Sequence, residues 1–212
     1  MRKIVVFLLL ALALSAVSCL KPQHRERTRM VDKELPLEII VDTVMMSHPD
    51  FFNNEVTKSD GNKDFEEAFF AMDTNQLEGI PLKLITVNKA NGKYMAQFRS
   101  FGTPEGFKFV NSIDELNCDV LTVIPDDIVA SLKEKEQYIL HGRIINRIKS
   151  IELFDKMLGT STMAATYDFE IRKVENYDNK RFLDVCLGML YFKLDSINPY
   201  TKREQIEEKY IE

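Results

Sequence analysis

The chain lacks tryptophan and contains little histidine, cysteine or glycine. Its 212 residues include no Trp, three His, three Cys and eight Gly. Zinc sites need three or four closely spaced His, Cys, Asp or Glu ligands, and no H-x-x-x-H or C-x-x-C pair occurs. The G-x-S-x-G element of hydrolases and the G-x-x-x-x-G-K-[ST] phosphate loop are also missing. We therefore predict no catalytic residue, no cofactor and no metal site.

An excess of basic residues is missing as well. Lys and Arg number 28 against 33 Asp and Glu, so the formal net charge is −5. Proteins that hold nucleic acid neutralise its phosphates with clustered Lys and Arg. The acidic balance therefore argues against a nucleic-acid partner. With 45% apolar and 29% charged residues, the composition is otherwise that of an ordinary globular protein.

One long apolar run is present, and it lies at the start of the chain. Residues 4–17 (IVVFLLLALALSAV) follow the cations Arg2 and Lys3. These fourteen residues are too few to cross a bilayer, which takes roughly 20, but they have the length of a signal-peptide core. The run ends in Ala16-Val17-Ser18-Cys19, which resembles the lipobox of bacterial lipoproteins.

The resemblance to bacterial lipoproteins implies the fate of this leader. In that family a dedicated peptidase removes the leader, here residues 1–18, and acyl chains are attached to the cysteine, here Cys19. Two or more such chains hold a protein stably on a membrane. Because no acidic residue closely follows Cys19, the resemblance implies the outer membrane, with the orientation left open. The alternative is ordinary secretion, with Cys19 a chance residue.

Residues 19–34 are polar and have no apolar period, so we expect a flexible tether after the lipidated cysteine. Its cations could attract an anionic lipid surface, or the segment is a solvated linker. The two remaining cysteines, Cys118 and Cys186, lie in apolar segments that resemble strands. An exported chain meets an oxidising compartment, so they either form a disulfide or remain as two inert core thiols.

The next segment, residues 35–76, has a helical pattern and is expected to pack on the main domain. Pro36 suits a first helical turn, and the helix should end before His48-Pro49. Residues 53–64 are rich in turn formers, and a second short helix is predicted after Asp64. One face of the first helix is predicted at Leu37, Ile40, Val41, Val44 and Met45, and one face of the second at Phe65, Ala68, Phe69 and Met72.

Residues 77–198 are predicted to form a β-rich domain. Asn91-Gly92 between two alternating segments is a strong hairpin signal, and Gly142 suggests a bulge. The last strand is apolar on both faces except at Asp184 and should lie centrally. Strands are predicted at 82–87, 94–99, 118–124, 138–145, 167–172 and 182–194. Helices are predicted at 112–115, at 125–136 and at the C-terminus (199–212), where Thr201–Glu204 forms a capping box.

The order of these elements across residues 80–192 resembles an OB-fold, in which five strands close a small barrel and a helix lies between the third and fourth. The stretch 126–145 (DDIVASLKEKEQYILHGRII) is similar to the helix and fourth strand of OB proteins. A β-sandwich and an open antiparallel sheet with helices on one face are the alternatives. All three predict an α+β fold that is mainly antiparallel, as an OB-like small barrel or a sandwich with short flanking helices.

Three groups of residues were considered as binding sites. His141 lies on a predicted strand and is expected to be a structural residue rather than a ligand or catalytic base. Asp60-Gly61-Asn62-Lys63-Asp64 begins as a calcium loop does, but Phe65 and Ala71 stand where an EF-hand needs Gly and Glu, so a solvated turn is favoured. Tyr94, Phe98 and Phe101 either stack on a ligand, as exposed aromatics of OB barrels do, or pack in the core.

These observations favour a non-enzymatic binding or structural module on a lipid anchor. It would bind an envelope protein or a small ligand. The alternative is a lipid-anchored hydrolase acting on glycan or peptidoglycan, which would need a cleft with two acids whose pKa values differ.

Overall fold

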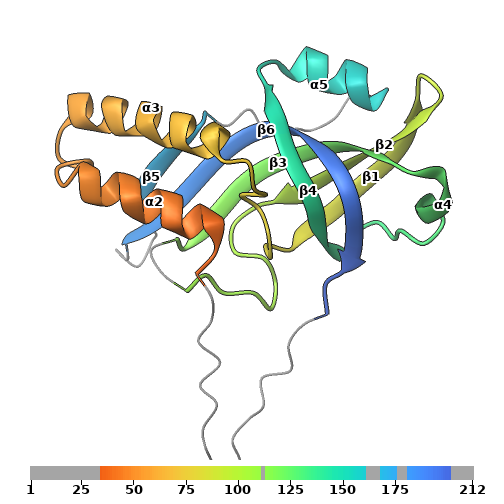
Figure 1. The fold of residues 1–212 in the computed structure, drawn as a ribbon, viewed down its shortest axis with the longest axis horizontal. Coiled ribbons are helices and arrows are strands. Elements are labelled where there is room, and N and C mark those ends of the chain that lie inside the picture. The colour runs from red at the N-terminus through yellow and green to blue at the C-terminus, as the bar shows by residue number, and fades with distance from the viewer. Residues whose placement is uncertain (1–33, 111–112, 161–167, 176–180, 202–212) are drawn as a thin grey trace, which may run out of the picture. The chain divides into compact units, whose positions relative to one another are not determined.

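The computed structural model describes residues 34–110, 113–160, 168–175 and 181–201. These residues form the predicted α+β architecture with a mainly antiparallel sheet (Figure 1). The strands are β1 (Leu82–Ala90), β2 (Lys93–Ser100), β3 (Glu115–Ile124), β4 (Gln137–Ile148), β5 (Glu170–Glu175) and β6 (Arg181–Pro199). The helices are α2 (Pro36–Ser47), α3 (Glu55–Ala71), α4 (Asp126–Val129) and α5 (Ile151–Leu158).

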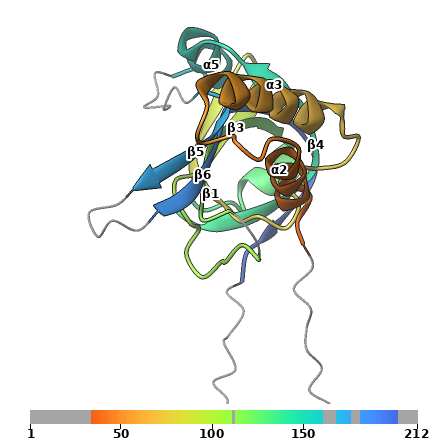
Figure 2. The same ribbon diagram turned by 90° about the vertical axis from the view of Figure 1, so that its left-hand side faces the viewer.

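The sheet closes partly into a barrel. Its strands follow the order β3-β2-β1-β4-β6-β5, and β3 also pairs with β6. That pairing is parallel, whereas all other pairings are antiparallel. It joins β1, β2, β3, β6 and β4 into a ring, which Figure 2 shows from one end. The barrel is therefore the correct alternative, and β6 is central as predicted because it pairs with three strands.

Two local predictions in the sheet are confirmed. Asn91 and Gly92 both have positive φ angles, 51° and 78°, as the tight turn between β1 and β2 requires. The register of β4 against β6 shifts between His141 and Gly142, which is the predicted bulge. Gly142 has a φ of +151°, and a Cβ there would meet the carbonyl oxygen of Lys193. Glycine is therefore needed at this close approach of two strands.

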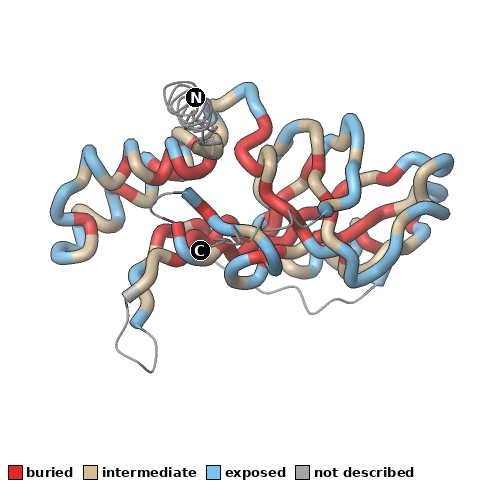
Figure 3. The backbone as a smooth tube through the Cα atoms, turned by 90° about the horizontal axis from the view of Figure 1, so that it is seen from below, coloured by how far each residue is buried: buried red, intermediate tan, exposed pale blue. Residues whose placement is uncertain are grey.

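The main core lies inside the barrel and continues under the first two helices. Leu37 and Val41 of α2 and Phe65 and Phe69 of α3 belong to the same buried cluster as Leu84 of β1. Figure 2 shows α2 and α3 at the end of the ring nearest the viewer. In Figure 3 the buried segments follow the strands and the inner sides of these helices. Helices α2 and α3 thus share the main core with the sheet.

A second, smaller cluster lies on the opposite face of the sheet, beneath α5. Phe154 and Leu158 of this helix are fully buried against Met95 of β2, Leu121 of β3 and Met189 of β6. Ser150 caps the helix by accepting a hydrogen bond from the backbone N–H of Leu153. No element had been predicted at this position. The helix covers one end of the outer face of the barrel.

The prediction of a turn at residues 53–64 was wrong, because α3 already begins at Glu55. Asn54 is its N-cap and accepts hydrogen bonds from the backbone N–H groups of Val56 and Thr57. Gly61 is a helical residue that packs against Phe51, and a Cβ at Gly61 would lie 2.5 Å from the ring. The glycine that suggested a turn is instead needed for close packing. The Asp60–Asp64 segment is helical and cannot wrap a calcium ion as an EF-hand loop does.

The structure differs from the prediction at two other helices. No helix forms at 113–115, since Glu115 begins β3 and the Asp114 N–H donates to the Leu183 carbonyl. Helix α4 ends at Val129 instead of continuing to Glu136. The N–H of Leu132 donates to the carbonyl of Val129, three residues back, as in a turn, and Lys135 has a positive φ of 72° and donates its N–H to the Leu84 carbonyl. The predicted leader, Cys19, the tether and the C-terminal helix beyond Thr201 lie outside the described residues.

Candidate functional site

The most distinctive feature is a line of polar side chains on the outer face of β2, β3, β6 and β5. Side chains alternate along a strand, and in β3 the residues Leu116, Cys118 and Val120 face the main core. Asn117 and Asp119 therefore point outward, although both are almost completely buried. We call the set the polar row; it consists of Gln97, Arg99, Asn117, Asp119, Arg172 and Asp184.

One half of the polar row centres on Asp119, whose side chain has no exposed surface. Its Oδ1 accepts hydrogen bonds from Nε2 of Gln97 and Nε of Arg99, both at 2.8 Å. Its Oδ2 accepts a third from Nη2 of Arg99 at 3.3 Å. A buried carboxylate is costly unless it is paired and hydrogen-bonded, and Arg99 provides a bidentate partner.

The other half centres on Asp184 of β6. Its Oδ1 accepts a hydrogen bond from Nδ2 of Asn117 at 2.6 Å, and its Oδ2 accepts one from Nη2 of Arg172. Asn117 continues the chain of bonds, because its Oδ1 accepts from the N–H of Gly102 at 3.2 Å. The row thus links three strands to the loop after β2. Nε of Arg172 is buried and makes no hydrogen bond to a described residue, but it lies 3.8 Å from Oε1 of Glu170, within ion-pair distance.

At the Arg172 end the polar row opens into a surface depression of about 470 Å³, which we call the outer depression. Glu115 lies directly opposite Asp184 in the parallel register of β3 and β6. Burial raises the pKa of Glu115 above its ordinary value, and the charges of Asp184 and Asp114 raise it further. The residues that line the outer depression are Lys58, Glu115, Glu170, Arg172, Lys173, Val174, Glu175, Phe182 and Asp184.

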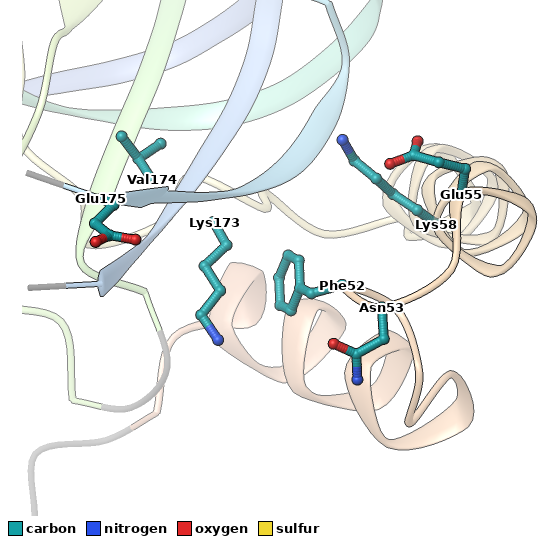
Figure 4. A pocket seen from close by; sticks show the side chains of 7 residues that line it. All are labelled: Phe52, Asn53, Glu55, Lys58, Lys173, Val174 and Glu175. Atoms are coloured by element: carbon teal, nitrogen blue, oxygen red, sulfur yellow. The ribbon is translucent and has the colours of Figure 1, made fainter. Parts of the chain in front are cut away.

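A second depression of about 400 Å³ lies between β5 and the segment that joins α2 to α3 (Figure 4). Nζ of Lys173 lies 5.4 Å from the centre of the Phe52 ring, an arrangement that permits a cation–π contact. We call this depression the β5 groove; it is lined by Phe52, Asn53, Glu55, Lys58, Lys173, Val174 and Glu175. The groove thus places acidic and basic side chains around the aromatic ring of Phe52.

The two cysteines are free thiols and do not form a disulfide. Cys118 faces the main core, whereas Cys186 points to the outer face, where its Sγ lies 3.7 Å from Oδ2 of Asp184. Burial raises the pKa of each thiol to about 12, with a further contribution from Asp119 at Cys118 and from Asp184 at Cys186. Both thiols therefore stay protonated and inert near neutral pH, as one of the two interpretations predicted.

The two histidines that the structure describes have hydrogen-bond partners. Nδ1 of His141 lies 2.8 Å from Oε1 of Glu78, and its Nε2 lies 3.1 Å from Nδ2 of Asn198. Nε2 of His48 lies 2.8 Å from Oδ2 of Asp64. Both ring nitrogens of His141 therefore have partners within the fold. Within the described ranges, no three His, Cys, Asp or Glu side chains gather as a metal site would require.

Two of the three aromatic residues considered as a stacking surface do not form one. Phe98 is fully buried and packs edge-to-face against Tyr138, with ring centres 6.1 Å apart. Tyr94 is partly buried against the main core. Phe101, with 75% of its surface exposed, is the most accessible of the three. It directly precedes Gly102, the residue that bonds Asn117 of the polar row.

No sequence motif marks the polar row. The sequence did contain part of the signal for the polar row, because Asp184 is the one acidic residue in a mostly apolar predicted strand. Asn117 and Asp119 likewise alternate with the apolar residues of β3. The pairing of β3 with β6, which unites these positions, joins residues about 70 positions apart in the chain and has no local sequence signal.

Comparison with known proteins does not identify this site. No protein-family model matches the chain, and no curated protein sequence matches it significantly. Among the described residues, no helix is both long and apolar enough to span a bilayer.

Proposed function

We propose that this protein is a lipid-anchored bacterial envelope lipoprotein whose barrel is a non-enzymatic binding module. The leader and Cys19 support the anchor, as does their resemblance to the lipobox of bacterial lipoproteins. The resemblance implies that the protein is located at the outer membrane. The partner would be an envelope protein or a small polar ligand.

The observation that carries the binding role is the outer depression at the end of the polar row. Arg172 and Asp184 face it, and their positions are fixed by hydrogen bonds that reach into the sheet. Binding sites commonly combine a few fixed polar groups with apolar surface, which Val174 and Phe182 supply here. The Arg172 side chain is 35% exposed, so its guanidinium is accessible from the depression. A ligand with an acceptor oxygen would pair with this group.

The connectivity of the barrel supports the resemblance to an OB-fold. Five strands close in the order β1-β2-β3-β6-β4, and α4 lies between β3 and β4. OB proteins bind ligands on the face formed by their second and third strands. The polar row crosses that face on β2 and β3. Under this proposal β5 is an additional strand, and the outer depression extends the binding face.

The anchor is tested by replacing Cys19 with Ala. The unmodified chain should fractionate with membranes and carry acyl chains detectable by mass spectrometry. Cys19→Ala should carry no acyl chains. Absence of acyl chains on Cys19 of the unmodified chain would contradict the anchor, whatever the barrel binds.

The binding role is tested with the full-length Cys19→Ala chain, immobilised and exposed to an envelope extract. Mass spectrometry of the retained proteins and small molecules would compare this chain with Arg172→Gln and Asp184→Asn. We expect at least one retained species that both changes release. Arg143→Gln, which changes an exposed arginine of β4, is the matched control and should retain it. Identical retention by all four chains would contradict the outer depression as the binding site.

One observation favours the hydrolase as a second candidate. Glu115, with its raised pKa, lies opposite Asp184, and glycosidases use one protonated and one ionised carboxyl group. This candidate predicts that the purified chain releases fragments from peptidoglycan and that Glu115→Gln abolishes the release. Absence of any hydrolysis by the unmodified chain would exclude this substrate.

A further inference from the structure

Strand β5 has an outer edge that no other described strand pairs with. The direction of its backbone groups follows from one hydrogen bond, because the N–H of Ile171 donates to Oδ1 of Asn62 in α3, at 2.9 Å, and not to β6. In an antiparallel pair, alternate residues turn their N–H and C=O groups away from the neighbouring strand. Lys173 and Glu175 therefore direct their backbone groups outward as well.

The β5 groove lies along this same part of the edge. Helix α3 meets β5 at Ile171 through Asn62, whereas at Lys173 and Glu175 the neighbouring surface is the groove. Figure 4 shows β5 on one side, the first turn of α3 on the other and Phe52 between them. An extended segment that paired with β5 would place side chains over Phe52. Addition of a strand to such an edge is a common mode of recognition.

The charges along the edge indicate which segment fits. Residues directly opposite each other in an antiparallel pair stabilise it when their charges are opposite and destabilise it when they are alike. A strand that complements β5 must therefore present an acid opposite Lys173 and a base opposite Glu175. Read in the antiparallel direction, β5 itself has this pattern, with Val174 at its centre.

We propose that β5 pairs antiparallel with β5 of a second copy of this chain, with Lys173 opposite Glu175 of the partner. Val174 then lies opposite its own copy on the two-fold axis, which gives the self-complementary contact of a symmetric dimer. Shifting the register places Lys173 opposite Lys173, or Glu175 opposite Glu175. Both shifts oppose like charges, so a single register is favoured.

Charged residues on an edge strand also serve to prevent pairing, and this is the competing explanation of Lys173 and Glu175. The short paired stretch indicates a weak dimer, since stable interfaces bury roughly 1,600 Å². If the chain is anchored as proposed, confinement to a membrane raises its local concentration, and weak contacts are then populated. The pairing itself does not require the anchor.

Single cysteines on β5 test the register in the full chain. Val174→Cys should form a disulfide-linked dimer under mild oxidation, because directly opposed Cβ atoms lie about 4.5–5.5 Å apart, close to disulfide geometry. Lys173→Cys and Glu175→Cys should cross-link much less. Cys118 and Cys186 are buried, so they should not contribute a background in the folded protein. Oxidation would be carried out on membranes and on the Cys19→Ala chain, so that loss of the anchor and loss of pairing are distinguished.

Reversal of charge supplies the matched control. In the Val174→Cys background, Lys173→Glu opposes like charges and should yield about tenfold less dimer. Adding Glu175→Lys restores opposite charges and should restore the cross-link. Circular dichroism would establish that each variant is folded. Absence of the Val174→Cys dimer on membranes and in solution, equal cross-linking at all three positions, or a dimer yield unaffected by Lys173→Glu would each overturn the proposal.

Discussion

Asp119 shows how much the fold depends on a single buried charge. Replacing it with Ala leaves Gln97 and Arg99 without the acceptor that they share. Because removal of one partner of a buried ion pair typically costs 3–5 kcal/mol, and Arg99 is partly exposed, we expect Asp119→Ala to lower the free energy of unfolding by about 3 kcal/mol. Asp119→Asn should cost less because it retains an acceptor oxygen. Urea denaturation measures both.

The control for Asp119 is Asp73→Ala, because Asp73 is an exposed acid outside the helices and strands. Its effect should stay within about 0.5 kcal/mol. If the two alanine variants lost equal stability, the polar row would not be a stabilising feature of the folded protein.

The two buried thiols predict an alkaline limit to stability. Their pKa values are about 12 in the folded chain against an ordinary 9.0, so the unfolded chain loses these protons first as the pH rises. Stability from this source is fully present below pH 9 and is lost progressively between pH 9 and about 12. A Cys118→Ala, Cys186→Ala double variant should show a shallower decline over this range. Equal slopes in urea denaturation at several pH values would contradict the assignment.

At the scale of secondary structure, the bulge in β4 depends on one glycine. Gly142→Ala should lower the free energy of unfolding by more than about 3 kcal/mol, because the new methyl group would collide with the backbone of Lys193. Gly92→Ala is the matched control. Gly92 also has a positive φ, of 78°, but no atom lies within 4 Å of an added Cβ, so only about 1 kcal/mol of backbone strain is expected. Thermal unfolding followed by circular dichroism compares the two.

The sequence predicted those elements whose signals are local. The β1–β2 hairpin is specified by Asn91-Gly92, and the face of α2 by its apolar spacing. The predictions were wrong where packing against distant parts of the chain determines the local structure. Gly61 suggests a turn until Phe51 is seen to occupy the space of its missing side chain. Helix α5 is short, and its stability depends on the sheet surface that it covers.

The candidate site was less predictable than the fold. Its residues come from four strands, and each pair of partners is distant in the chain. Arg172 and Asp184 have ordinary positions in their own strands, and only the register of β5 against β6 shows that they face each other. No motif marks such a row, because hydrogen bonds across a sheet can be formed by many combinations of polar residues. The polar row becomes visible only when the strands are placed side by side in the three-dimensional structure.

At the scale of the whole molecule, β6 holds the barrel together. It pairs with β3, β4 and β5, so a chain that ends at residue 180 cannot close the ring. We expect this truncated chain to lack a cooperative thermal transition and near-ultraviolet circular dichroism, whereas the full chain shows both. A sharp transition in the truncated chain would mean that the first five strands form an independent unit.

The position of β6 in the chain also affects how the protein folds during its synthesis. During synthesis the ring cannot close until β6, which follows the other five strands in the chain, has been made. Until then β3 and β4 lack the strand that lies between them in the ring, and their edges are exposed. Unpaired strand edges of this kind can pair with other chains, so we expect the nascent protein to be most prone to misassembly before β6 emerges.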